Sequence, residues 1–152
     1  MITPFRKKHL TILLKNSLVS KISLDLLVHK YFKVNRSLGS KDRLHIKKAL
    51  YEIYKWRLLL NHYGANTPDQ LIDLYTSSHC PIGKADLKVP AHARSSFPKW
   101  LYQKLEDSLG EKEALRFCSA SNTQAPITIR ANKVKCDPEN FYNKFKNPLL
   151  LT

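Results

Sequence analysis

Glycine is scarce in this sequence, with four residues among 152, at positions 39, 64, 83 and 110. Loops that hold nucleotide-type cofactors use closely spaced glycines, because only glycine lets the backbone approach the ligand. Here no two glycines are closer than nineteen residues. Walker, His-Glu-x-x-His and Gly-x-Ser-x-Gly motifs are also missing. We therefore expect no cofactor-binding, metal or catalytic residue in this chain.

Long apolar runs are missing as well. No stretch approaches the roughly 18 apolar residues of a membrane span, and the basic N-terminus lacks the apolar core and cleavage site of a signal peptide. The cysteines, Cys80, Cys118 and Cys136, are odd in number and have no metal-ligand spacing. These features predict a cytoplasmic protein with reduced cysteines and no membrane span.

Acidic residues are few, with 12 Asp/Glu against 26 Lys/Arg and a formal net charge of +14. Residues 1–60 hold 14 basic and 3 acidic side chains, whereas residues 61–152 hold 12 and 9. Such a lopsided charge favours a phosphate-bearing partner, nucleic acid first and an anionic membrane second. A basic composition without a specific partner is the alternative.

The first ninety residues carry helical patterns. Pro4 can begin a helix with Leu10, Leu13 and Leu14 on one side. Ser23 is a suitable N-cap for a second helix, whose apolar stripe is formed by Leu24, Leu27, Val28, Tyr31 and Phe32. Thr67-Pro68 predicts the start of a short helix, and residues 77–95, with two prolines and a glycine, predict a linker with at most a short helix.

The helix between these elements is expected to be central. Ser40 would cap it, and it would run to about Tyr63 before Gly64 ends it. The positions that predict its buried side are Ile46, Ala49, Leu50, Ile53, Trp56 and Leu60. A second apolar strip, Leu44, Tyr51 and Leu58, predicts packing on two sides.

Basic residues on this helix are the first candidates for nucleic-acid binding. Lys41, Lys48 and Lys55 are seven residues apart and therefore share one helix face. The remaining candidates nearby are Arg36, Arg43 and Lys47. Together these residues could bind phosphates. A solvated outer face is the alternative for any one of them.

The last third of the chain predicts helix, helix, strand and helix. Pro98 begins a helix carrying Trp100, Leu101, Leu105 and Leu109, which Gly110 closes, and residues 111–120 form the next, with Ala114, Leu115 and Cys118 inward. Alternation of Ile127, Ile129 and Ala131 with polar residues predicts a strand over 125–134. Asp137-Pro138 would then begin a helix bearing Phe141 and Phe145. Arg130, Asn132 and Lys135 alternate outward or lie just past the strand, and are further RNA-binding candidates.

Two runs carry a family resemblance. The run LGSKDRLHIKKALYEIYKWR, residues 38–57, resembles the helical N-terminal region of the Sun (Fmu) family of RNA cytosine-C5 methyltransferases, which is similar to the antitermination factor NusB. The motifs Ser96-Phe97-Pro98-x-Trp100-Leu101, Leu109-Gly110-Glu111, Ala120-x-Asn122 and Ala125-Pro126-Ile127-Thr128-x-Arg130-x-Asn132-x-x-Lys135 resemble the passage of the same family into its catalytic portion.

The resemblance implies that the catalytic residues lie in a different domain from the residues of this chain. Family members bind S-adenosylmethionine in a Rossmann-like domain that follows these motifs, and attack cytosine with a thiolate in a Pro-Cys or Thr-Cys context. In this sequence Cys80 follows His79, Cys118 follows Phe117 and Cys136 follows Lys135, so no catalytic residue carries over. The chain is therefore expected to be the N-terminal part of such an enzyme, inactive alone, with a separately encoded methyltransferase domain as a possible partner.

The resulting prediction is a mainly α protein. Residues 1–93 would form a NusB-like helical RNA-binding bundle, and residues 94–152 the first elements of an RRM- or ferredoxin-like subdomain. The predicted function is binding of rRNA or tRNA for cytosine-C5 methylation. The alternative is a stand-alone NusB-like module that binds RNA or protein in transcription or ribosome assembly; a methyltransferase domain encoded directly downstream would favour the former.

Overall fold

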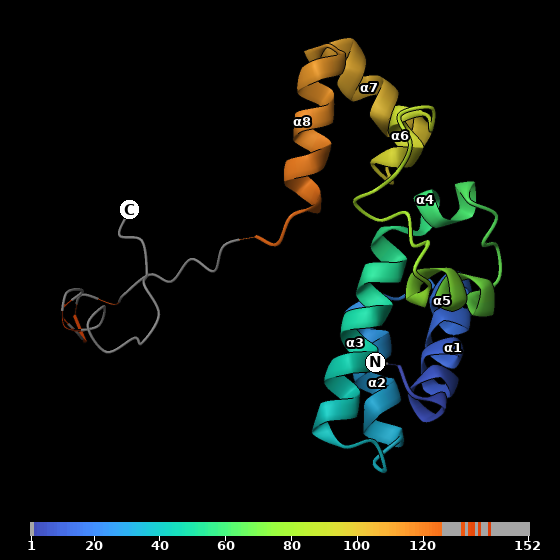
Figure 1. The fold of residues 1–152 in the computed structure, drawn as a ribbon. Coiled ribbons are helices and arrows are strands. Elements are labelled where there is room, and N and C mark those ends of the chain that lie inside the picture. The colour runs from blue at the N-terminus through green and yellow to red at the C-terminus, as the bar shows by residue number, and fades with distance from the viewer. Residues whose placement is uncertain (1, 126–131, 133, 136, 138–139, 141–152) are drawn as a thin grey trace.

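The computed structural model describes residues 2–125, 132, 134–135, 137 and 140 (Figure 1). Within these residues the chain forms eight helices and no strand, which confirms the mainly α prediction. The helices are α1 (Pro4–Val19), α2 (Leu24–Val34), α3 (Ser40–Lys55), α4 (Arg57–His62), α5 (Pro68–Thr76), α6 (Ala91–Arg94), α7 (Lys99–Leu109) and α8 (Glu111–Asn122). No helix in the described part is long and apolar enough to cross a membrane.

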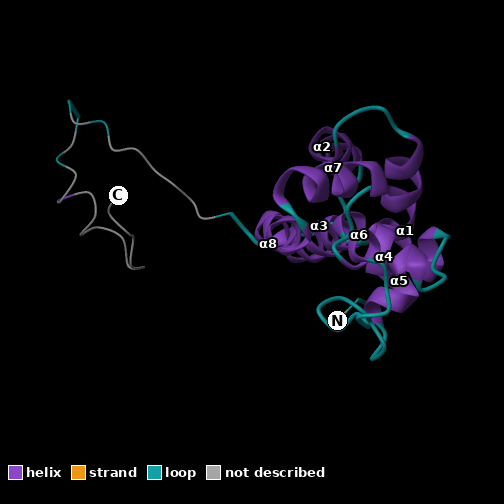
Figure 2. Cartoon of the chain, turned by 90° about the horizontal axis from the view of Figure 1, so that it is seen from above, coloured by secondary structure: helices purple, strands orange, loops and turns teal. Residues whose placement is uncertain are grey.

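Helices α1, α2, α3 and α5 form a bundle around the largest apolar core (Figures 1 and 2). On α1, Leu10, Leu13 and Leu14 are at most 1% exposed, as their spacing predicted. The caps agree as well, because the hydroxyl of Ser23 accepts from Leu26 N at 3.4 Å, at the start of α2. Local patterning therefore accounts for most of the bundle.

Helix α3 is shorter than predicted. The prediction of one helix to about Tyr63 is wrong, because the helix breaks at Trp56, where α3 ends and α4 begins. The Ser96 hydroxyl lies at this break, where it donates to Lys55 O at 2.8 Å and accepts from Leu58 N at 3.2 Å. The hydroxyl thus binds one backbone carbonyl and one backbone N–H that would otherwise pair within the helix. A side chain that inserts between helical hydrogen-bonding groups in this way bends or divides a helix.

Two details of α3 also differ from the prediction. Gly39 is the N-cap, and Ser40 is already helical, because Gly39 has the extended backbone of a cap and its carbonyl accepts from Arg43 N at 3.0 Å. Leu44, predicted to be on a second packed strip, is 67% exposed. Helix α3 packs mainly on α1, with further contacts to α4 and α5, and Leu44 lies on a flank that these helices leave open.

Helices α7 and α8 form a hairpin at the other end of the molecule (Figure 1). Gly110, at φ +78°, makes the tight turn between them, a conformation that L side chains rarely adopt. The core of the hairpin consists of Tyr102, Ala114 and Cys118, so the inward prediction for the last two is confirmed. Trp100, in contrast, is 64% exposed.

The short helix α6 connects the two parts. Ala93 packs with Leu59 and Val89 in a second apolar cluster, whereas Ala91 packs on the hairpin core. The linker prediction for residues 77–95, with at most a short helix, is therefore confirmed. The predicted strand over 125–134 and the helix bearing Phe141 and Phe145 lie almost wholly outside the described residues, and the division at residue 93 stays a prediction.

Candidate nucleic-acid interface

One side of α3 carries a row of polar side chains. The row is Lys41, His45, Lys48, Glu52 and Lys55, and we call it the α3 strip. Spacings of four and three residues place all five on the same helix face, beside the buried face of Ile46 and Ile53. The prediction that Lys41, Lys48 and Lys55 share a face apart from the core is confirmed.

The first part of the α3 strip is available to a ligand. Lys41, His45 and Lys48 are all exposed. The ring of His45 is fixed by a 2.7 Å contact between its Nδ1 and Lys41 O. Within residues 2–125 neither Lys41 nor Lys48 forms an ion pair. These two ammonium groups can therefore pair with phosphate oxygens without breaking an internal contact.

A groove of about 500 Å³ runs along this part of the strip, between α1, α3 and α5. His45 and Lys48 line one side, Asp73, Tyr75 and Thr76 the other. Ile2, Ala49 and Ile72 also line the groove, as does Lys7, which is ion-paired with Asp73. The arrangement of an apolar surface with basic residues beside it suits a nucleotide, which has an apolar base and an anionic phosphate.

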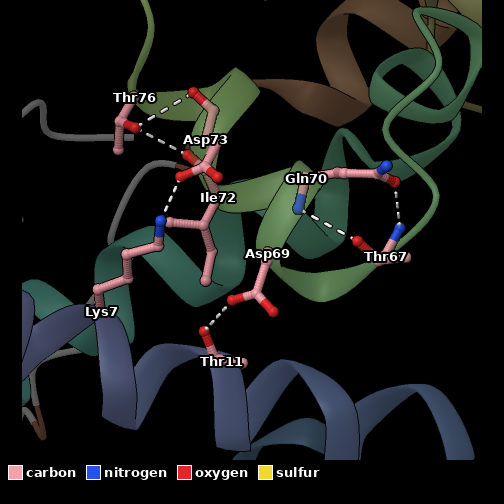
Figure 3. Close-up of polar contacts among 8 residues, drawn as sticks. All are labelled: Lys7, Thr11, Thr67, Asp69, Gln70, Ile72, Asp73 and Thr76. Carbon is pink, nitrogen blue, oxygen red and sulfur yellow. Dashed lines mark hydrogen bonds and ion pairs between the residues drawn. The ribbon is translucent and has the colours of Figure 1, made fainter.

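Polar contacts join the α5 wall of the groove to α1, as Figure 3 shows. Lys7 of α1 is ion-paired with Asp73, and Thr11 donates to Asp69 at 3.0 Å. A capping box joins Thr67 and Gln70 at the start of α5. Within the wall, the Thr76 hydroxyl donates to Ile72 O at 2.9 Å. These contacts hold α5 against α1 on this side of the groove.

Lys55, at the end of the strip, has a structural contact. Its Nζ donates to Glu52 Oε1 at 2.9 Å and to Asn122 O at 3.2 Å, and lies 5.6 Å from the centroid of the Trp56 ring. Asn122 is the last residue of α8. Lys55 therefore ties the end of α8 to α3, and its use as a free phosphate ligand would break this tie.

Arg43 and Lys47 lie on the opposite flank of α3, toward α2. Arg43 Nε donates to Leu38 O at 2.8 Å, and its guanidinium lies 5.7 Å from the Phe32 centroid. Lys47 Nζ lies 3.9 Å from Asp25 Oδ1 and 5.4 Å from the Tyr51 centroid. The structure thus separates these two candidates from the α3 strip. Arg36 is exposed in the loop between α2 and α3.

Tyr51 also belongs to the flank of α3 that carries Arg43 and Lys47. Its hydroxyl donates to the Asp25 carboxylate. Burial, and then the hydrogen bond to Asp25 and the charge of Asp25, raise the pKa of Tyr51 to about 12. Asp25 is thus shared by a cation and a phenol, and the flank is a polar network within the protein.

The remaining candidates follow α8. Asn132 and Lys135 are exposed, and Lys135 N donates to Asn132 O at 2.9 Å. Arg130 lies outside the described residues. The binding role of all nine candidates stays a prediction, and of these the structure places Lys48 at the groove, with Lys41 two turns earlier on the same helix face.

Sequence reasoning missed three residues of the groove, Lys7, His45 and Tyr75. His45 could have been found, because it is four residues after Lys41 and three before Lys48. Lys7 and Tyr75 have no such signal, since they reach the groove from other helices. Burial raises the pKa of Tyr75 above its usual value, with smaller effects from Glu52 and Cys80.

No group of three or more His, Cys, Asp or Glu side chains that could hold a metal occurs among the described residues. Cys80 is partly exposed and Cys118 is fully buried in the hairpin core. Burial raises the pKa of the Cys118 thiol, which disfavours the nucleophilic thiolate.

Comparison with known proteins bears on the C-terminal third. A family model described as Methyltr_RsmF/B-like, ferredoxin-like domain, matches residues 97–148. No curated protein and no solved structure matches the chain. The matched segment begins one residue after Ser96 and includes all of α7 and α8. The match shows that this segment, about a third of the chain, is similar to the ferredoxin-like domain of such methyltransferases.

Proposed function

We propose that this chain is the RNA-binding N-terminal portion of an S-adenosylmethionine-dependent cytosine-C5 methyltransferase that acts on rRNA or tRNA. The methyltransferase chemistry belongs to another domain or chain, because no loop or thiolate suited to it occurs in this sequence. The role of the present residues is to hold the RNA and present it to that domain.

The match at residues 97–148 is the observation that carries the proposal. It concerns a ferredoxin-like domain of methyltransferases, and in this chain the matched segment is joined directly to a basic helical bundle. Residues 1–60 hold 14 basic and 3 acidic side chains, and a charge of this kind attracts RNA over distances of about a Debye length.

The α3 groove supports RNA as the ligand of the bundle. Lys41 and Lys48 have no ion-pair partner within residues 2–125, and the groove beside Lys48 is walled by Tyr75 and Ile72. Phosphate contacts to lysines position an RNA strand without reading its sequence. The strip ends where Lys55 contacts Asn122 O, so a strand that follows it would be led toward the matched segment.

A stand-alone NusB-like module that binds RNA or protein is the second candidate. The observation that favours it is the separate core of the bundle, built from α1, α2, α3 and α5 without any contribution from the matched segment. Such a bundle could act without a methyltransferase. Loss of methylation of a defined cytosine when this chain is deleted would support the first candidate, and unchanged methylation would support the second.

The test of RNA binding compares two double variants of equal charge. Lys41→Gln/Lys48→Gln removes the unpaired ammonium groups of the strip, and Lys84→Gln/Lys88→Gln removes two exposed lysines of the linker. In a fluorescence anisotropy titration with a short unstructured RNA, we expect the first to weaken binding roughly tenfold and the second less than twofold. Equal effects of both variants would contradict a specific role of the α3 strip.

A further inference from the structure

A second hollow, of about 590 Å³, lies where α4, α6 and the start of α7 meet. We call it the junction hollow. Its volume falls in the range of roughly 300–1,000 Å³ that is usual for small-molecule sites. The side chains that matter for its chemistry are those of Arg57, His62, His92, Phe97 and Lys99. It is distinct from the α3 groove, with which it shares no lining residue.

The lining of the junction hollow has charge of one sign. Arg57 comes from α4, His62 from the end of α4, His92 from α6 and Lys99 from the first position of α7. No Asp or Glu is among the lining residues. Two permanent cations with no acidic side chain beside them select an anion. Leu58, Ala93, Phe97 and Pro98 give it an apolar surface, and Asn61 adds a neutral amide.

The walls of the junction hollow are set by the break in the central helix. Ser96 adopts a positive φ of 56°, which costs energy for a residue other than glycine. Its hydroxyl is held by Lys55 O and Leu58 N, and the next residue, Phe97, donates its N–H to His92 O at 2.9 Å. These contacts bring Phe97 and Pro98 beside α4, at the wall of the hollow.

Arg57 is also held in place. Its guanidinium lies 5.2 Å from the centroid of the Tyr54 ring, and the residue is only partly exposed. A guanidinium stacked on an aromatic ring loses little further freedom when it pairs with a phosphate, and its fork can bind two phosphate oxygens. Lys99, in contrast, is exposed and can adapt to the ligand.

We propose that the junction hollow is a second RNA-binding site, which takes an unpaired nucleotide with its phosphate at Arg57 and Lys99 and its base against Phe97 and Pro98. This proposal rests on the proposed function, since it assigns a further site to the same RNA. Charge complementarity selects the phosphate, and an aromatic wall suits a base, because every nucleobase has a face that stacks on a ring. The hollow adjoins the first residue of the segment that matches the methyltransferase family. Phe97, Pro98 and Lys99 are the first residues of that segment, so a nucleotide bound here would be held at its start.

The test uses the full chain and a short unstructured RNA that carries 4-thiouridine. We compare Arg57→Gln/Lys99→Gln with Lys84→Gln/Lys88→Gln, which removes the same charge from the exposed linker. We expect the first variant to weaken binding roughly tenfold and the control to change it less than twofold. Ultraviolet crosslinking of the parent should yield an adduct in the peptide that contains His92 and Phe97.

The outcomes separate this inference from the proposed function. If Arg57→Gln/Lys99→Gln binds RNA normally and Lys41→Gln/Lys48→Gln binds it weakly, the proposal of a second site at the junction hollow is overturned. RNA binding at α3 then still stands. Crosslinks confined to α3 would lead to the same conclusion. An absence of RNA binding by the parent would overturn both. If Arg57→Gln lowers the melting temperature, Lys99→Gln alone replaces the double variant, and unchanged affinity in that variant counts against the site.

Discussion

The hydroxyl of Ser96 donates to the carbonyl oxygen of Lys55 at 2.8 Å, across 41 positions of sequence. The same hydroxyl accepts from Leu58 N, so one side chain satisfies two groups that an unbroken helix would pair internally. This contact ends α3, allows α4 to begin, and fixes the junction between the basic bundle and the hairpin of α7 and α8. The junction hollow depends on this contact, because Leu58 and Phe97, on either side of it, line that hollow.

Replacing Ser96 with alanine should therefore destabilise the protein. Two hydrogen bonds of about 0.5–1.5 kcal/mol each are lost, which predicts a loss of about 1–3 kcal/mol in the free energy of unfolding. Chemical denaturation measures the loss, and Ser108→Ala, an exposed position on α7, is the matched control with an expected change within about 0.5 kcal/mol. Equal stability of the two variants would show that the Ser96 bridge contributes nothing.

Lys55 should behave differently from Lys48, although both belong to the α3 strip. Lys55→Met removes the contacts to Glu52 and Asn122 O and should cost about 1 kcal/mol, because these contacts are partly solvated. Lys48→Met, at an exposed position, should leave stability nearly unchanged. Hydrogen exchange gives a second measure, since loss of the tie should speed exchange at the end of α8. An unchanged exchange rate at the end of α8 would show that the contact between Lys55 and Asn122 O does not stabilise this end.

Removing the hydroxyl of Tyr102 should not lower the stability of the protein, in contrast to removing that of Ser96. The side chain is 5% exposed, and its hydroxyl is buried without a hydrogen-bond partner among the described residues. Burial raises its pKa, with smaller effects from its charged neighbours. A buried unsatisfied hydroxyl costs about 1–3 kcal/mol, so Tyr102→Phe should keep or raise the melting temperature. A clear decrease would mean that the hydroxyl does have a partner, and Tyr102→Leu would report the packing alone.

The described cysteines should react at different rates. Cys80 is partly exposed, whereas Cys118 is fully buried and has a raised pKa, so its thiolate is scarce near neutral pH. A thiol reagent followed by peptide mass spectrometry should modify Cys80 first in the folded protein. In denaturant the two should react alike. Rapid modification of Cys118 in the folded state would indicate that the hairpin core opens readily.

Features that depend on neighbouring residues in sequence were predictable. Leu10, Leu13 and Leu14 form the buried side of α1 because their spacing places them on one face. The capping box of Thr67 and Gln70 follows in the same way from local hydrogen bonding. The position of Lys41 and Lys48 on one exposed face of α3 required only the helical period.

Features that depend on distant residues were not predictable. The sequence around Trp56 contains neither proline nor glycine, so no local signal predicts the break between α3 and α4. Ser96, which is distant in sequence, binds the backbone at this break. Lys55 resembles Lys48 in sequence, and its different role arises because α8 brings Asn122 O to it. The junction hollow likewise needs residues of three helices, and no spacing in the sequence links Arg57 to His92 and Lys99.

The most direct test of the central claim is the salt dependence of RNA binding. The logarithm of the association constant for a short single-stranded RNA should fall linearly with the logarithm of salt concentration, with a slope of about −0.7 per phosphate contact. Lys41→Gln/Lys48→Gln should make this slope less steep by about 1.4, which is two contacts. Binding that does not depend on salt, or a double variant that retains the slope of the parent, would contradict the account.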